Sequence, residues 1–185
     1  GQVVAVADTG IDTGVNDGTM HPDLRGQIAS IYTWGRPGDA SDPNGHGTHV
    51  AGSIAGTGSA SGGQIKGMAY GAKLVFQSIM DGKGSLEIPY DLTRLFSQAY
   101  NAGARVHSDS WGSGRNEYDS TARDVDSFLW QNPDMTVVIA AGNSGGSSSG
   151  GTAYNSVSSP ATAKNAIAVG ASENIRPEKG SLADN

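Results

Sequence analysis

The chain has 185 residues, with 18 acidic and 12 basic side chains and a net charge of −6 at pH 7. This length suits one domain with a substantial core. The acidic balance argues against a nucleic-acid partner, whose phosphates require clustered Lys and Arg. No apolar run is long enough to span a bilayer, so no membrane partner is expected. The lack of cysteine excludes disulfides, thiolate nucleophiles and cysteine-bound zinc.

Five short apolar segments predict buried strands, and segments with helical periodicity lie between them. The first strand is Val3–Ala7, at the start of the chain. The others are Leu74–Phe76, Ala104–Val106, Thr136–Ala140 and Ala166–Val169. Alternation of strands and helices at this spacing favours an α/β fold with a mostly parallel sheet.

Three helices are predicted. One follows His46 and has an apolar side. A second is predicted over residues 91–100, with Asp91 as its N-cap, because apolar residues recur at i, i+3, i+4 and i+7. Those apolar residues are Leu92, Leu95, Phe96 and Ala99. The third begins at Asp119 and Ser120.

Ligands of parallel α/β sheets bind beyond the carboxyl ends of the strands. That rule selects three loops in this chain as candidate functional segments. They are Asp8-Thr9-Gly10, the segment from Ser108 to Gly112, and the segment from Gly142 to Gly145.

Two residues in this part of the chain suit acid–base chemistry. Asp8 ends the first predicted strand, where a carboxylate can hold an imidazole in one tautomer and stabilise its charged form. Alternatively, Asp8 is an ordinary turn former. His46 stands between Gly45 and Gly47 at a helix start, which keeps bulk away from the ring, as a general base requires. Alternatively, His46 makes only ordinary hydrogen bonds at the end of a helix.

A metal site is a further alternative, because His46 and His49 could share one face of a helix. The segment lacks the His-Glu-x-x-His pattern and an obvious third ligand. No metal ligand is therefore predicted, and His49 is expected to be structural. A metal-dependent hydrolase built on Asp8 and the two histidines is the less favoured function.

Asn143 follows the predicted strand 136–140 and could aim its amide at a developing oxyanion. Alternatively, Asn143 is a turn residue. The glycines around it match neither nucleotide-binding pattern, so no nucleotide cofactor is expected.

Together these segments resemble the subtilisin-like serine proteases (subtilases, peptidase family S8). Val-Ala-Val-Ala-Asp8-Thr-Gly-Ile-Asp resembles the Asp motif of the family, and His46-Gly-Thr-His-Val-Ala-Gly resembles its His motif. Ser110-Trp111-Gly112 is similar to the substrate-binding strand, and Ala140-Ala141-Gly142-Asn143 is similar to the oxyanion segment. The order of Asp before His is that of subtilisin. The wider sequence resembles the oxidatively stable alkaline proteases of bacilli.

The resemblance implies a three-layer fold with helices on both faces of the sheet. It also implies that His46 is the general base, Asp8 its orienting carboxylate and Asn143 the oxyanion donor. The substrate-binding residues that it implies are Ser110, Trp111, Gly112, Ala140, Ala141, Gly142 and Gly84. The first three would accept the peptide as an added strand, with Gly84 on the peptide's other side. Ala140, Ala141 and Gly142 would line the pocket for the residue before the cleaved bond.

The function that the resemblance implies is a secreted, monomeric serine endopeptidase that cleaves protein or peptide substrates through an acyl-enzyme. No serine here stands in the family's Gly-Thr-Ser-Met-Ala-x-Pro motif. In subtilisin the nucleophile lies about 157 residues after the histidine. We therefore expect residues 1–185 to be a partial catalytic domain, truncated on its C-terminal side and inactive alone. A noncatalytic peptide-binding relative is the alternative.

The chemistry of such an enzyme needs no cofactor, but some family members bind structural calcium. Asp23 matches a calcium ligand of the family. The loop over residues 56–67 lacks the Asn-rich pattern that would complete the site. The sequence therefore leaves structural calcium open, but no complete calcium-binding motif supports it.

Overall fold

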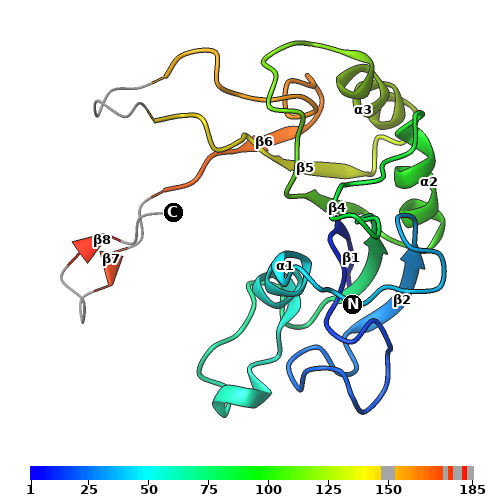
Figure 1. Cartoon of the computed structure of the whole chain (residues 1–185), viewed down its shortest axis with the longest axis vertical. Helices are drawn as coiled ribbons and strands as arrows, with labels where there is room; N and C mark the ends of the chain where they lie inside the picture. Colours follow the sequence, from blue (N-terminus) through cyan, green and yellow to red (C-terminus); the bar gives the residue numbers. More distant parts are fainter. Residues whose placement is uncertain (147–152, 173–174, 177–180, 183–185) are drawn as a thin grey trace.

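The computed structural model describes residues 1–146, 153–172, 175–176 and 181–182. Six strands and three α-helices form its main body (Figure 1). The strands are β1 (Val3–Asp8), β2 (Ile28–Thr33), β3 (Lys73–Ser78), β4 (Val106–Asp109), β5 (Thr136–Ala140) and β6 (Ile167–Val169). The helices are α1 (His46–Ala55), α2 (Thr93–Asn101) and α3 (Ser120–Gln131), with a 3₁₀ turn at Ser59–Ser61. A small antiparallel pair consists of β7 (Ile175–Arg176) and β8 (Ser181–Leu182).

The six strands form one parallel sheet in the order β2-β3-β1-β4-β5-β6. The first strand of the chain therefore lies inside the sheet, between β3 and β4. Its last residue, Asp8, pairs in register with Ser78 of β3. On the other side, Ala7 pairs with Asp109, the last residue of β4. Because all strands run the same way, the loops after β1, β4 and β5 emerge at one edge of the sheet.

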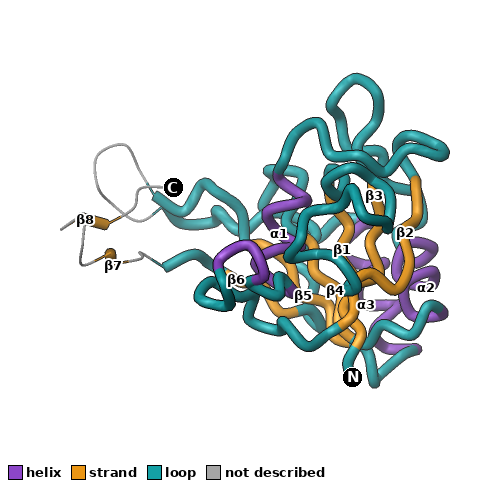
Figure 2. Tube along the Cα trace, turned by 90° about the horizontal axis from the view of Figure 1, so that it is seen from below, coloured by secondary structure: helices purple, strands orange, loops and turns teal. Residues whose placement is uncertain are grey.

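Helix α1 covers one face of the sheet, and α2 and α3 cover the other (Figures 1 and 2). Under α1, the core includes Val6, Leu74, Phe76, Ala51 and Ala55. Under α2 and α3, it includes Ala7, Leu95, Phe96, Val125 and Phe128. This arrangement confirms the predicted three-layer α/β fold with helices on both faces.

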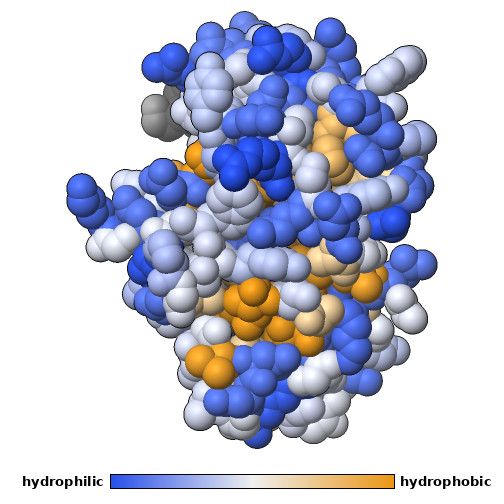
Figure 3. Space-filling view, turned by 90° about the vertical axis from the view of Figure 1, so that its right-hand side faces the viewer, coloured by the Kyte–Doolittle hydropathy of each residue, from blue (hydrophilic) through white to orange (hydrophobic). Residues whose placement is uncertain are grey.

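The surface is mainly hydrophilic on the side that faces right in Figure 1, with a hydrophobic area in the lower half and smaller ones in the upper half (Figure 3). In the part of the chain that the structure describes, no helix is both long and apolar enough to cross a membrane.

Three strands differ from the prediction. β6 was predicted to be buried, but all three of its residues are exposed. β2 was not predicted because it is an edge strand in which only Ile28 is buried, so its apolar pattern is weak. β4 begins at Val106 rather than Ala104, because the Ala104 N–H bonds to the Ala99 carbonyl and closes the end of α2. The rest of β4 buries polar side chains, which a hydrophobic pattern does not reveal.

The two helix starts differ in how they are capped. Asp119 is the N-cap of α3, and its Oδ1 accepts the Ala122 N–H at 3.1 Å. Helix α2 begins at Thr93, and its N-cap is Leu92, one residue later than the predicted Asp91. Asp91 still accepts the Thr93 N–H at 3.0 Å, so it supports the first turn from one residue further out.

Asp119 should contribute to stability through this cap. Burial acts to raise its pKa, but hydrogen bonds from Ser159, Thr121 and Ala122 outweigh burial and hold the pKa below its ordinary value of 3.8. Asp119→Ala should therefore lower the free energy of unfolding by about 1–2 kcal/mol at pH 7. A group with a depressed pKa stabilises the fold above its unfolded pKa, so the deficit should shrink as the pH falls below 3.8.

Urea unfolding at several pH values measures this effect, with Ser120→Ala, at the exposed neighbouring position, as the control. A deficit that is independent of pH, or equal in the two variants, would contradict the role of the carboxylate.

Candidate active site

The end of β1 and the start of α1 bring an acid and a base into contact. His46 Nδ1 lies 2.7 Å from Asp8 Oδ1. The Asp8 side chain is 2% exposed, whereas the His46 side chain is 50% exposed. A buried carboxylate of this kind holds the proton of a neutral ring on Nδ1 and leaves Nε2 available to a reacting group. The pair can thus move a proton at a surface that substrate can reach.

Backbone groups hold Asp8 in place. Its Oδ1 also accepts the Thr9 N–H at 2.7 Å, and its carbonyl accepts the Ile79 N–H at 2.8 Å. The Thr9 hydroxyl in turn accepts the Gly47 N–H at 2.9 Å, which joins the loop after β1 to the first turn of α1.

Gly47 allows this close approach. A Cβ at this position would overlap the Gly10 carbonyl oxygen and lie 3.1 Å from the Asp8 Cβ. Any larger residue would therefore push α1 away from the end of β1. The glycines around His46 were predicted to keep bulk away from the ring, but the contacts of Gly47 are with Asp8 at the end of β1 and with Gly10 in the loop after it.

Asp42 is a further residue of the site, which the sequence analysis missed. Its Oδ1 accepts the Thr9 hydroxyl at 2.8 Å and the Gly45 N–H at 2.9 Å, and its Oδ2 accepts the Thr48 N–H at 2.8 Å. Burial acts to raise its pKa, but the hydrogen bonds from Thr48, Thr9 and Gly45 outweigh burial and lower it. The Asp42 carboxylate thus fastens the start of α1 to the loop after β1. The feature of the sequence that could have identified Asp42 is its position four residues before the start of a helix.

Asn143 lies exposed in the loop after β5. It lines a cavity of about 830 Å³ together with Ala141, Gly142, Ser156 and Val157. No hydrogen bond joins Asn143 to Asp8 or His46 among the described residues. The structure therefore brings the acid and the base together and leaves Asn143 at the rim of a neighbouring cavity.

The segments 110–112 and 140–142 meet at Ser158, which the sequence analysis also missed. A Cβ on Gly112 would lie 2.8 Å from the Ser158 Oγ, and one on Gly142 would lie 3.0 Å from it. The Ser158 N–H donates to the Ala141 carbonyl at 3.0 Å. The hydroxyl of Ser158 therefore lies between two of the segments that the resemblance assigns to substrate.

Ser110 and Trp111 are both half-buried. The Trp111 indole N–H donates to the Ala7 carbonyl at 3.1 Å, and the ring packs against the core under α2 and α3. The side chain of Trp111 is thus committed to the protein interior.

Gly84 lies exposed in a tight turn, with the Gly84 N–H donating to the Asp81 carbonyl at 3.3 Å. The Asp81 carboxylate accepts the N–H groups of Lys83 and Ser85, each at 2.8 Å, and these bonds lower its pKa. A cavity of about 450 Å³ separates this turn from Asn44, two residues before His46.

Asp23, which matches a calcium ligand of the family, forms hydrogen bonds to the loop after α1. Its Oδ1 accepts the Ala60 N–H at 2.7 Å, and its carbonyl accepts the Thr57 N–H at 2.9 Å. These two bonds join the turn that carries Asp23 to the loop over residues 56–67. Within the described ranges, no three His, Asp or Glu side chains are grouped to bind a metal ion.

A second Asp–His contact lies on the opposite face of the sheet. His107 Nδ1 is 3.2 Å from Asp109 Oδ1, and His107 Nε2 is 2.9 Å from Gln77 Oε1. Both side chains are fully buried, and the ring of Phe96 packs edge-on against His107. This pair cannot reach a substrate, so only the Asp8–His46 pair is a candidate for catalysis.

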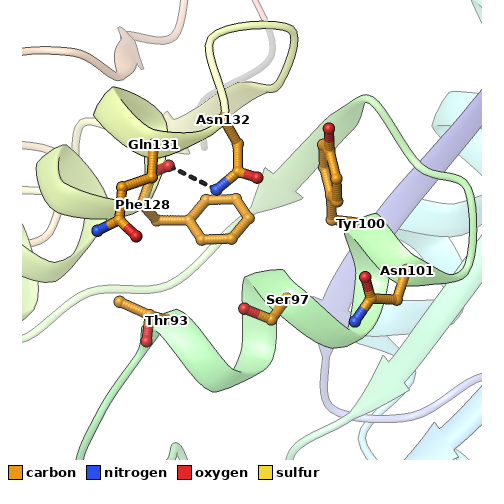
Figure 4. Close-up of a pocket in the computed structure, with 7 residues that line it drawn as sticks. All are labelled: Thr93, Ser97, Tyr100, Asn101, Phe128, Gln131 and Asn132. Carbon is orange, nitrogen blue, oxygen red and sulfur yellow. Dashed lines mark hydrogen bonds between the residues drawn. The ribbon is translucent and has the colours of Figure 1, made fainter.

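A cavity of about 220 Å³ between α2 and α3 is also separate from the candidate site. Thr93 and Ser97 of α2 face Phe128 of α3 across it (Figure 4). At its rim the Asn132 side chain donates to the Phe128 carbonyl at 2.9 Å. The sheet separates this cavity from α1 and His46.

Comparison with known proteins gives a consistent result. The chain matches the sequence model of the Subtilase family (Peptidase_S8) over residues 1–184. It is 36% identical to the "Serine protease/ABC transporter B family protein tagB" of Dictyostelium discoideum, over 94% of this chain and 10% of that protein. It is 35% identical to "Subtilisin BL" of Lederbergia lenta, over 94% of this chain and 56% of that protein.

Solved structures also resemble this one. "Sphericase" superposes with a TM-score of 0.68 at 29% identity, covering 99% of this chain and 59% of that chain. The psychrophilic subtilisin-like protease Apa1 of Pseudoalteromonas sp. AS-11 superposes with a TM-score of 0.62 at 22% identity, covering 90% and 35% respectively, which supports the fold alone. The chain thus spans only part of the length of each of these proteins.

The close approach of α1 to β1 predicts opposite effects for two glycines of the same helix. Gly47→Ala should lower the free energy of unfolding by about 1–3 kcal/mol, because the added methyl group overlaps backbone. Gly52→Ala should raise it by about 0.5–1 kcal/mol, because a Cβ there meets nothing within 4 Å and alanine favours the helix. Urea unfolding measures both. Equal effects of the two substitutions would contradict the tight contact at Gly47.

Proposed function

Because this chain belongs to the subtilase family, we propose that it is part of a serine endopeptidase that hydrolyses peptide bonds through an acyl-enzyme intermediate. The observation that carries this proposal is the 2.7 Å contact between the buried Asp8 carboxylate and the half-exposed His46 ring. The chain spans at most about half the length of the curated relatives described above. The activity therefore belongs to a protein that includes further segments.

In this mechanism His46 is the general base. Its Nε2 takes the proton of the serine hydroxyl as the oxygen attacks the scissile carbonyl, and the ring later gives that proton to the leaving amine. Asp8 keeps the proton of the neutral ring on Nδ1 and stabilises the imidazolium that forms. The bond from the Thr9 N–H supports this role, because it fixes the carboxylate oxygen that faces the ring.

The nucleophile is proposed to come from a segment outside these 185 residues. None of the serines of this chain stands in the family's Gly-Thr-Ser-Met-Ala-x-Pro motif. Ser110 belongs to a segment assigned to substrate, and Ser158 lies between two such segments. The chain alone is therefore proposed to hold an acid–base pair that has no nucleophile to activate.

The proposed substrate is a protein or peptide in an extended conformation. Ser110-Trp111-Gly112 would pair with the substrate through its backbone, and Gly84 would flank the substrate on the other side. The residue before the cleaved bond would enter a pocket lined by Ala140-Ala141-Gly142. The Ser158 hydroxyl would contribute a polar group there, since it approaches both Gly112 and Gly142.

Asn143 is proposed to donate its side-chain amide to the oxyanion of the tetrahedral intermediate. Its exposed position at the mouth of the cavity after β5 is compatible with this role. We further propose that the protein acts outside the cell as a monomer and without a cofactor. Similarity to bacterial subtilisins supports the proposed location, and a serine mechanism by itself requires neither a metal nor a nucleotide.

The origin of the nucleophile can be tested by active-site labelling. A serine-directed fluorophosphonate probe should not label the 185-residue chain, but should label the same chain extended through the segment with the serine motif. Extended protein carrying His46→Ala should lose the labelling, because the hydroxyl is no longer activated. Stoichiometric labelling of the 185-residue chain would show that the nucleophile is already present and contradict this assignment.

The roles of Asn143 and Asp8 predict different losses in the extended enzyme. Asn143→Ala should lower kcat by about 100- to 1000-fold with little change in KM, because the lost donor acts in the transition state. Asp8→Asn should lower kcat by about 10,000-fold, because the amide favours the wrong tautomer of His46. Steady-state kinetics on a chromogenic peptide measures both, with the exposed Asn101→Ala on α2 as the control. Near-normal turnover of either variant would refute the role of that residue.

A further inference from the structure

The side chain of Trp111 reaches the strand that carries Asp8. Its indole N–H donates to the Ala7 carbonyl at 3.1 Å, across 104 positions of sequence. The ring packs against the core under α2 and α3, which includes Ala7. The family resemblance assigns the backbone of this segment to substrate, but it does not explain why a tryptophan side chain stands here.

The position of the bond in the sheet suggests the reason. Pairing of β1 with β4 ends at Ala7 and Asp109, because the chain leaves the sheet after Asp109. Ala7 therefore lies at the last point where β4 supports β1. The Trp111 indole N–H donates a hydrogen bond to the Ala7 carbonyl at this point. On the other side of β1, pairing with β3 continues through Asp8, whose carbonyl accepts the Ile79 N–H at 2.8 Å.

The two oxygens of the Asp8 carboxylate are held unequally. Its Oδ1 binds the Thr9 N–H and the His46 ring, but its Oδ2 is buried and has no hydrogen-bond partner among the described residues. The carboxylate is thus fixed through one oxygen only. The Ala7 carbonyl belongs to the same peptide unit as the Asp8 N–H. Holding that carbonyl limits rotation of the peptide plane, and so limits the directions in which the Asp8 side chain can point.

We propose that Trp111 is a positioning residue for the Asp8–His46 pair, acting through the Ala7 carbonyl. This inference rests on the proposed function, because it gives the segment that binds substrate a second role in orienting the general base. The backbone of Trp111 faces the peptide, and its indole N–H secures the strand end from which Asp8 reaches His46. Loss of the N–H loosens Asp8 and weakens its hold on the Nδ1–H tautomer of His46.

Trp34 provides a matched control. Its indole N–H donates to Gln98 Oε1 at 2.9 Å, and its ring packs against the same core as Trp111. Its donor does not contact β1. Trp34→Phe therefore removes an indole hydrogen bond of similar length from the same core and leaves the Ala7 carbonyl untouched.

The test is the tautomer of neutral His46, read from its ring ¹⁵N chemical shifts in the 185-residue chain. We expect the proton mainly on Nδ1 in the wild type. Trp111→Phe should lower the ratio of the Nδ1–H to the Nε2–H form by about fivefold, the effect of one lost hydrogen bond. Trp34→Phe should leave the ratio unchanged. An unchanged ratio in Trp111→Phe, or equal shifts in both variants, would overturn the proposal.

A second substitution separates the hydrogen bond from packing. Benzothienylalanine at position 111 keeps the shape of the indole but replaces the N–H with sulfur, so it remains informative if Trp111→Phe unfolds the chain. It should shift the tautomer ratio in the same direction, and an unchanged ratio would overturn the proposal.

In the extended enzyme, benzothienylalanine at position 111 should lower kcat about fivefold without changing KM. A rise in KM with an unchanged tautomer would instead make Trp111 a substrate contact. The tautomer measurement does not require proteolysis, so it stands even if labelling contradicts the proposed function.

Discussion

The distance between the start of α1 and the end of β1 determines whether Asp8 can reach His46 at all. Gly47 permits that distance, because any side chain there would meet the backbone of Gly10. Thr9 and Asp42 then fix it, through hydrogen bonds between the loop after β1 and the first turn of α1. The acid–base contact therefore depends on backbone packing around the two reactive side chains.

The two Asp–His contacts show how the fold separates similar chemistry by access. Asp8 and His46 lie where a strand ends beneath a helix start, so the ring keeps one side towards solvent. His107 and Asp109 lie within β4 on the other face, under α2 and α3, where Gln77 satisfies the far nitrogen of the ring. The residues are of the same types in both places. Only the first pair is placed where a substrate could exchange a proton with it.

Much of this arrangement could be predicted from sequence. The strand-end rule selected Asp8 because β1 is almost uniformly apolar, and the pattern of α3 together with Asp119 located that helix correctly. The edge strand β2 was missed because an edge carries little hydrophobic signal. Ser158 was missed because its position between Gly112 and Gly142 depends on tertiary packing.

The direction of a side chain was likewise beyond the sequence pattern. The motif around Trp111 indicated its segment but not that the ring turns towards Ala7, since that choice depends on where β4 ends. Asp42 illustrates a different limit. It was not identified from the sequence, because its carboxylate joins the start of α1 to the loop after β1, and that contact depends on tertiary packing.

The order of the strands has a consequence for how the chain folds. β1 is made first, but its neighbours in the sheet, β3 and β4, follow only after long stretches of other chain. Each parallel pairing must close a large loop before it gains any stabilising contact, which slows folding. During synthesis the strand that carries Asp8 therefore cannot pair with its sheet neighbours until residues 73–78 and then 106–109 have emerged, and the sheet cannot fix the acid opposite the base before then.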